Sequence, residues 1–121
     1  MPPTLVSASP TDATTEPLGP APRLAPGRYL AIEAGGERRM VRLQDGATHI
    51  GRSWAADIVL EDQAVSRRHA IVFATNDSVR ILDDRSANGT RVNGAQVTGA
   101  QLADGDVVQV GRAVLIYREI G

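Results

Sequence analysis

The sequence predicts an all-β fold, a sandwich of two mainly antiparallel sheets. Its apolar runs are short, frequent and rich in Val and Ile, and turn residues such as Gly, Asn and Asp separate them. No amphipathic stretch is long enough for a useful helix, and only residues 66–70 are compatible with a single helical turn. Short strands at frequent intervals are typical of sandwiches, in which two sheets bury one face each against a shared core.

The strands are expected, in order, at residues 28–33, 38–43, 58–60, 69–74, 79–82, 107–110 and 113–117. The first two alternate polar and apolar residues, and Gly35-Gly36 between them predicts a hairpin turn. Further turn signals are Asn76-Asp77, Asn88-Gly89, Asn93-Gly94 and Asp104-Gly105. Because a sandwich collects its loops at its two ends, loop residues far apart in sequence can share one surface.

The chain divides into two regions of different composition. All seven prolines fall within the first 26 of the 121 residues, together with many Ser and Thr and few large apolar residues. Such a segment buries too little apolar surface to offset its conformational entropy, so residues 1–26 are expected to form a disordered tail. Residues 27–121 are long enough for one domain with a single core.

Composition excludes several classes of function. A net charge of −1 and an aromatic content of 3% argue against nucleic-acid binding. Without Cys, and with only His49 and His69, the chain offers no disulfide scaffold and no zinc site. No apolar run approaches the roughly 20 residues of a membrane span, and no secretory signal begins the chain, so a cytoplasmic location is expected. No nucleophile–base or acid–base pair is visible, and we expect neither an enzyme nor a cofactor.

Four short motifs follow one another in a fixed order: Gly51-Arg52, Ser66-Arg67-Arg68-His69, Ser86-Ala87-Asn88-Gly89-Thr90 and Val92-Asn93-Gly94. Each lies at the end of an apolar run, where a strand gives way to a loop. Their Arg, Ser and Asn side chains can therefore converge on one anion. A guanidinium can donate two parallel hydrogen bonds to a phosphate group. The pattern indicates a receptor for a phosphate carried on another polypeptide.

With these motifs, and with Asp57-Ile58-x-Leu60 between the first two, residues 27–121 resemble a forkhead-associated (FHA) domain, a module that binds phosphothreonine peptides. The resemblance implies that the phosphate is bound by Arg52, Ser66 and Arg67. It implies that the peptide is contacted at Asn88 and at its neighbour Ala87. Other family members have a hydroxyl at the Ala87 position, so one potential contact is missing here.

The resemblance assigns structural roles to further motif residues. Gly51 allows a tight turn before the phosphate-binding Arg, and Gly89 accompanies Asn88 in its turn. The ring nitrogens of His69 are expected to tie the recognition loops together, and Asn93 is expected to brace its own loop. Arg68 is expected to point away from the ligand.

The implied partners are phosphothreonine-containing proteins and a Ser/Thr protein kinase. Some short bacterial FHA proteins are similar in layout: an N-terminal threonine pair is phosphorylated and the domain folds back on it. Thr14 and Thr15 are therefore candidate phosphorylation sites, and the chain's own tail is a candidate ligand.

Two other functions remain open. One is a regulator that inhibits metabolic enzymes through the same face without needing phosphate. The other is a scaffold whose site has decayed, although the presence of Arg52, Ser66 and Asn88 argues against decay.

Overall fold

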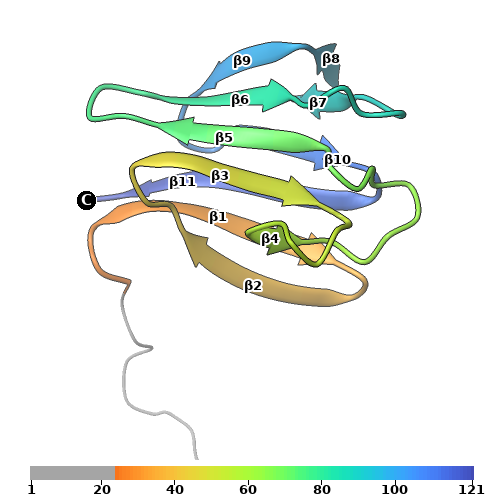
Figure 1. The fold of residues 1–121 in the computed structure, drawn as a ribbon. Coiled ribbons are helices and arrows are strands. Elements are labelled where there is room, and N and C mark those ends of the chain that lie inside the picture. The colour runs from red at the N-terminus through yellow and green to blue at the C-terminus, as the bar shows by residue number, and fades with distance from the viewer. Residues whose placement is uncertain (1–23) are drawn as a thin grey trace, which may run out of the picture.

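The computed structural model describes residues 24–121, which form a sandwich of two β-sheets and contain no helix (Figure 1). The predicted all-β sandwich is therefore confirmed. Nearly all of the predicted tail, residues 1–26, lies outside the described residues, so its disorder and its boundary at residue 27 stay predictions.

The first sheet has six strands in the order β2-β1-β11-β10-β7-β8. These strands are β1 (Gly27–Ala34), β2 (Glu37–Arg42), β7 (Thr90–Val92), β8 (Ala95–Val97), β10 (Val107–Val110) and β11 (Ala113–Ile120). The second sheet has five strands in the order β4-β3-β5-β6-β9. These are β3 (Gly46–Gly51), β4 (Ile58–Val59), β5 (Ala70–Ala74), β6 (Val79–Asp83) and β9 (Gly99–Leu102). Most strand pairs are antiparallel, and β3 pairs with β4 in parallel.

The core lies between the sheets because alternate residues of each strand face inward. In β5, for example, Val72 is buried while its neighbour Phe73 is exposed. Val72 belongs to one apolar cluster with Leu30 and Leu115 from the opposite sheet. Burial of this apolar surface, at about 25 cal/mol per Å², is the main force that holds the two sheets together.

Several expected elements differ from the structure. Strand β3 was not expected, because Gly46–Gly51 contains only one large apolar residue, Ile50. The strands β7, β8 and β9 were also missed, since each has three or four residues with few large apolar side chains. Residues 66–70, which the sequence left compatible with a helical turn, form no helix. The backbone N–H of Ser66 donates to the ring of His69, at 3.0 Å, instead of joining a helical hydrogen-bond pattern.

The turn signals correspond to turns in the structure. Gly35-Gly36 joins β1 to β2 with φ values of 59° and 79°. Asn93 and Gly94 join β7 to β8 with φ values of 51° and 87°, the left-handed pair that a tight hairpin favours. Gly105, with a φ of 90°, lies in the connection that carries the chain from one sheet to the other.

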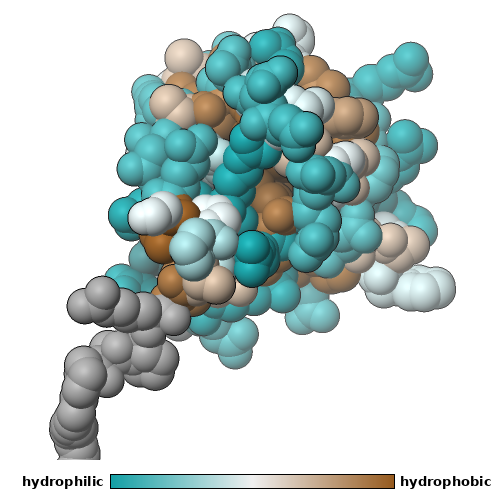
Figure 2. All heavy atoms as spheres, turned by 90° about the vertical axis from the view of Figure 1, so that its left-hand side faces the viewer, coloured by the Kyte–Doolittle hydropathy of each residue, from teal (hydrophilic) through white to brown (hydrophobic). Residues whose placement is uncertain are grey.

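Three loops gather at one end of the sandwich, on the right in Figure 1: residues 52–57, 60–69 and 84–89. We call them the β3–β4, β4–β5 and β6–β7 loops and, together, the recognition loops. The start of β1 and the C-terminus lie at the opposite end. That opposite end, which faces the viewer in Figure 2, is covered mostly by hydrophilic residues around a small hydrophobic centre.

Candidate functional site

The β3–β4 loop lies directly against the β4–β5 loop. The backbone N–H of Arg52 donates to the carbonyl of Ser66 at 2.9 Å, and that of Ser53 donates to the carbonyl of Arg67 at 3.2 Å. Gly51 makes this approach possible, because a Cβ atom there would lie 2.0 Å from the Arg67 carbonyl oxygen. Gly51 is therefore required for space. The tight turn expected there is not found, because Gly51 is the last residue of β3 and has no left-handed φ.

The β6–β7 loop lies on the other side of the β4–β5 loop and runs antiparallel to it. The backbone N–H of Asp84 donates to the His69 carbonyl at 2.8 Å. Further along, the Asn88 side chain donates to the Ala64 carbonyl at 2.9 Å. The β4–β5 loop is thus the central one of three adjacent loops, and Ser66 lies between the two contacts.

Arg52 and Ser66 are held in place by bonds that leave other donors free. Arg52 donates from Nε to the carbonyl of Val65, at 3.0 Å, and its two terminal amino groups make no hydrogen bond to the described residues. The hydroxyl oxygen of Ser66 accepts the backbone N–H of Ala87 at 2.8 Å, which leaves the hydroxyl hydrogen available. These two residues are therefore oriented by the fold and still able to donate to an anion.

Positive charge at the recognition loops is only partly compensated. Arg68 is paired with Asp84 at 3.1 Å. The other ion pairs among residues 24–121 involve arginines outside these loops. Neither Arg52 nor Arg67 has a carboxylate partner within the described chain, and both side chains are exposed. Two uncompensated guanidinium groups on adjacent loops favour an anion.

His69 links two of the recognition loops from their buried side. It is fully buried. Its Nδ1 accepts the backbone N–H of Ser66 at 3.0 Å, which requires that nitrogen to be unprotonated. Its Nε2 lies 2.9 Å from the carbonyl oxygen of Gly89 and is therefore the protonated nitrogen, donating to that oxygen. One neutral imidazole thus fixes the β4–β5 loop relative to the β6–β7 loop.

Asp83 supports the β6–β7 loop and was missed by the sequence analysis. Its carboxylate accepts the hydroxyl and the backbone N–H of Ser86 and the hydroxyl of Thr90, which is fully buried. The Ser86 hydroxyl oxygen in turn accepts the backbone N–H of Gly89. Burial opposes ionisation of Asp83, but these hydrogen bonds outweigh burial and lower its pKa below the ordinary value. The sequence signal that could have identified Asp83 is its position three residues before Ser86.

Asp62 anchors the β4–β5 loop to the turn between β10 and β11 and was also missed. Its carboxylate accepts the backbone N–H groups of Ala64 and Arg112, at 2.9 and 2.8 Å. These two bonds lower the pKa of Asp62. Gly111 leaves room for the contact, because a Cβ atom there would lie 2.7 Å from the Val65 side chain.

Asn93 lies away from the recognition loops. Its side chain donates to Asp106 and accepts the backbone N–H of Val107, both at 3.0 Å. It therefore braces the β7–β8 turn against the start of β10. Gly89, by contrast, lies in the β6–β7 loop with a φ of 86°, a conformation that favours glycine.

Comparison with known proteins places this chain among related sequences. A family model described as "Inner membrane component of T3SS, cytoplasmic domain" matches residues 34–121. The glycogen accumulation regulator GarA of Mycobacterium tuberculosis is 38% identical over 96 residues, which cover 78% of this chain and 59% of GarA. The oxoglutarate dehydrogenase inhibitor of Corynebacterium jeikeium is 37% identical over 75 residues, which cover 62% of this chain and 52% of that protein. This chain therefore spans only part of the length of either relative.

The solved structures decide the family. One structure, described as "Structural and functional analysis of phosphothreonine-dependent FHA domain interactions", is similar with a TM-score of 0.73 and 37% identity. The match covers 78% of this chain and 97% of that chain. The chain belongs to the FHA domain family.

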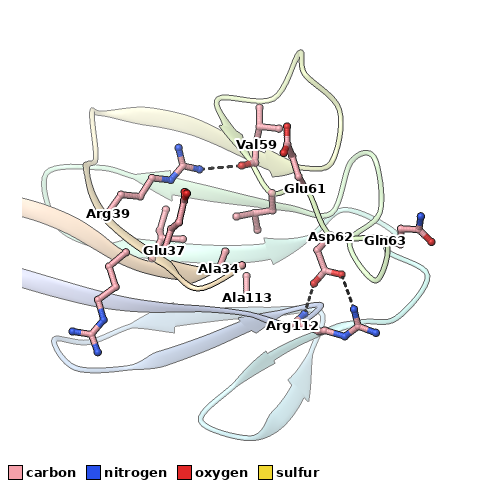
Figure 3. A pocket seen from close by; sticks show the side chains of 13 residues that line it. Ala34, Glu37, Arg39, Val59, Glu61, Asp62, Gln63, Arg112 and Ala113 are labelled. Atoms are coloured by element: carbon pink, nitrogen blue, oxygen red, sulfur yellow. Dashed lines mark hydrogen bonds and ion pairs between the residues drawn. The ribbon is translucent and has the colours of Figure 1, made fainter.

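Two hollows on the surface of residues 24–121 bear on the site, and the larger of these two contains none of the predicted site residues. It measures about 840 Å³ and lies between β2 and β4 (Figure 3). Arg39 crosses it and donates to the carbonyl of Val59, and Asp62 is paired with Arg112. The smaller hollow, of about 240 Å³, lies beside the recognition loops and includes Arg67 in its wall.

Within residues 24–121, no group of His, Asp or Glu side chains is arranged to hold a metal ion. The same part of the chain contains no helix that is long and apolar enough to cross a membrane.

Proposed function

We propose that this chain is a phosphothreonine-binding module that acts in Ser/Thr kinase signalling. The observation that carries the proposal is the free hydrogen-bonding capacity of Arg52, Ser66 and Arg67 on two adjacent loops. The side chains of Arg52 and Ser66 are oriented by bonds to the backbone, Arg67 is held through its backbone carbonyl, and neither arginine is neutralised by a described carboxylate. Such preorganised donors suit a dianionic phosphate.

In this proposal, Arg52, Ser66 and Arg67 bind the phosphate, while Asn88 holds the peptide backbone. The Asn88 side chain uses one N–H for Ala64, and its carbonyl oxygen and second N–H make no hydrogen bond to the described residues. Ala87 lies beside Ser66 and supplies surface contact only. Three or four hydrogen bonds to a charged group, at roughly 1.5–3 kcal/mol each, less the cost of ordering the peptide, give a Kd of about micromolar.

Support also comes from the solved relative, whose description concerns phosphothreonine-dependent interactions of an FHA domain. By this likeness the partners of our chain are phosphothreonine-containing proteins, and a Ser/Thr kinase produces the ligand. We place these interactions in the cytoplasm.

The test is a calorimetric titration of the dephosphorylated full chain with a phosphothreonine peptide library and its unphosphorylated counterpart. Arg52→Ala should weaken binding by about 10- to 100-fold, since it removes one or two charge-assisted bonds. Arg91→Ala, an exposed arginine on β7, is the matched control and should bind as the unmodified chain does. Equal binding of phosphorylated and unphosphorylated peptides would contradict the proposal.

A second candidate function is inhibition of a metabolic enzyme through the same face without phosphate. The likeness to the oxoglutarate dehydrogenase inhibitor favours it. It predicts that the unphosphorylated chain binds an unmodified oxoglutarate dehydrogenase in a pull-down and that Arg52→Ala and Asn88→Ala reduce that binding. If only phosphorylated ligands bind, this candidate is excluded.

A third element of the proposal is control by the chain's own tail. Thr14 and Thr15 lie outside the described residues. A spacer of about 12 residues from Thr15 to Gly27 spans about 37 Å when extended. Phosphorylated Thr15 must reach from the start of β1 to the recognition loops at the opposite end of the sandwich. The eight residues of β1, which runs between these two ends, span roughly 26 Å. The length is sufficient.

An effective concentration of about 1 mM would then exceed a micromolar Kd by 100-fold or more. Phosphorylating Thr15 should therefore block an external phosphopeptide, and a Thr15→Ala chain treated with the same kinase is the control. Equal affinity with and without the phosphate at Thr15 would rule out closure by the tail.

A further inference from the structure

The β3–β4 loop carries an unusual surface residue, Trp54. It is the only tryptophan of the chain, and 88% of it is exposed. The other exposed large apolar residues among those described are between 37% and 46% exposed. Trp54 lies two positions after Arg52, on a loop that we assign to ligand binding. Indole side chains are enriched at the centres of protein interfaces, where their large surface becomes covered.

A pocket lies next to this residue. It has a volume of about 240 Å³, and both chain neighbours of Trp54, Ser53 and Ala55, line it. Much of its wall is apolar and comes from Ala55, Ala56 and strand residues Ile50 and Ala70. The volume suits a single aliphatic or aromatic side chain of a ligand, which would be removed from water on entry.

The pocket adjoins the proposed phosphate site on the side away from Asn88. The β3–β4 and β4–β5 loops lie side by side, and backbone hydrogen bonds place Arg52 next to Ser66 and Ser53 next to Arg67. Arg67 adjoins the phosphate position and also lines the pocket. Asn88 contacts Ala64, which lies at the other end of the β4–β5 loop. A ligand stretched across Ser66 therefore has Asn88 on one flank and the pocket on the other.

The charges at the pocket favour one kind of occupant. Arg68 is neutralised by Asp84, at 3.1 Å, whereas Arg67 has no described carboxylate partner. A basic ligand residue would be repelled by Arg67, and an acidic one would have to displace water from an apolar wall. An apolar side chain, on a ligand whose phosphate neutralises Arg67, meets neither difficulty.

We propose that Trp54 and this pocket form a second specificity site for the phosphothreonine ligand, which takes an apolar side chain on the flank opposite to Asn88. The proposal rests on the phosphothreonine-binding function proposed above. Trp54 covers the apolar side chain, and Ala55 and Ala56 form its seat. The chain would then read two features of its ligand, the phosphate and one apolar residue a few positions away.

The first experiment is a titration of the dephosphorylated full chain with phosphothreonine peptides that carry Leu, Phe, Ala, Asp or Lys in turn at each position flanking the phosphothreonine. On one flank, Leu or Phe should bind about tenfold more tightly than Ala, Asp or Lys. Because Trp54 is the only tryptophan, its emission should shift to shorter wavelength with the apolar peptides and change less with the Ala peptides.

The second experiment compares variants. Trp54→Ala should weaken binding of the preferred apolar peptide about tenfold and leave the matching Ala peptide within about twofold, which a general loosening of the loop would not do. Ala56→Leu, which fills the pocket, should have the same selective effect. Phe73→Ala, at an exposed apolar residue on β5, is the matched control and should change neither.

The outcomes separate the two proposals. If Arg52→Ala weakens binding about 10- to 100-fold while Trp54→Ala weakens all peptides equally or none of them, the second specificity site is wrong and the phosphothreonine function stands. If no phosphothreonine peptide binds the dephosphorylated chain, both are wrong.

Discussion

The larger hollow and the recognition loops of this domain differ in how their polar groups are bonded. In the larger hollow, between β2 and β4, Arg39 donates to a backbone carbonyl and Arg112 is paired with Asp62. In the recognition loops, the hydrogen bonds of Arg52 and Ser66 hold these residues in place. The terminal amino groups of Arg52 and the hydroxyl hydrogen of Ser66 have no partner among the described residues. The larger hollow, of about 840 Å³, has the volume expected of a ligand site. The arginines at its rim, Arg38, Arg39 and Arg112, are each bonded to a carboxylate or a backbone carbonyl of the domain.

Under the proposed function, oriented donors on adjacent loops are a better guide to the site than volume is. A site for an anion must pair its charges with the ligand, so it cannot also pair them with its own carboxylates. The framework around such a site carries the opposite arrangement. The polar side-chain atoms of His69, Asp83 and Asp62 are bonded to other parts of the described chain. His69 and Asp62 fix the β4–β5 loop, which carries Ser66. Asp83 fixes the β6–β7 loop, which carries Asn88.

The strongest way to break this arrangement is Gly51→Ala. The added Cβ would lie 2.0 Å from the carbonyl oxygen of Arg67 and 2.8 Å from its carbonyl carbon, both of which are backbone atoms that cannot rotate away. The β3–β4 and β4–β5 loops must then separate. We expect a loss of more than about 3 kcal/mol in the free energy of unfolding, measured by urea denaturation, and loss of phosphopeptide binding.

Gly35→Ala, at the rim of the larger hollow, is the matched control. A Cβ there meets no atom within 4 Å, and only the φ of 59° opposes it. Its effect should be about 1–2 kcal/mol, with unchanged phosphopeptide affinity. If both variants lose stability equally, the close packing of the recognition loops is not what Gly51 supplies.

A smaller effect is expected from Asp83→Asn, which keeps the shape of the side chain and removes its charge. Because hydrogen bonds from Ser86 and Thr90 lower the pKa of Asp83 in the folded state, its contribution is present above the ordinary value of 3.8. It is lost as the pH falls through the lower folded pKa. The variant should be less stable by about 1–2 kcal/mol at pH 7, with the difference shrinking below about pH 4.

Urea denaturation at pH 7, 5 and 3 checks this. Asp77→Asn, which makes the same change of a carboxylate to an amide in the exposed turn between β5 and β6, is the control. A difference that grows on acidification would contradict the assigned pKa direction.

The sequence was sufficient to predict the sandwich and the loops that carry Arg52, Ser66 and Asn88, because local signals determine both. Val- and Ile-rich runs indicate strands, and Gly and Asn indicate turns. It was not sufficient for β3, whose Gly46–Gly51 segment is a strand because β5 pairs with it along its length. Pairing with a neighbour can make a strand from residues of weak propensity.

The supporting carboxylates were missed for a related reason. Asp62 acts on Arg112, which lies 50 positions further along the chain. Nothing near Asp62 in the sequence signals that contact. The motif serine and arginine are recognisable by their place in the family pattern, whereas the residues that hold them are defined only by the folded neighbours that they contact.

The smallest effects are expected in the larger hollow. Arg39→Ala removes one exposed side-chain bond to the Val59 carbonyl, which water can replace. Arg112→Ala removes an ion pair of 3.7 Å whose Arg side chain is 86% exposed, but it keeps the backbone N–H that Asp62 accepts. Both variants should therefore lie within about 0.5 kcal/mol of the unmodified chain in unfolding free energy. Their phosphothreonine-peptide Kd should also stay within about twofold, although each loses the same charge as Arg52→Ala. Should either of them weaken phosphopeptide binding as much as Arg52→Ala does, general positive charge rather than oriented donors would explain the affinity.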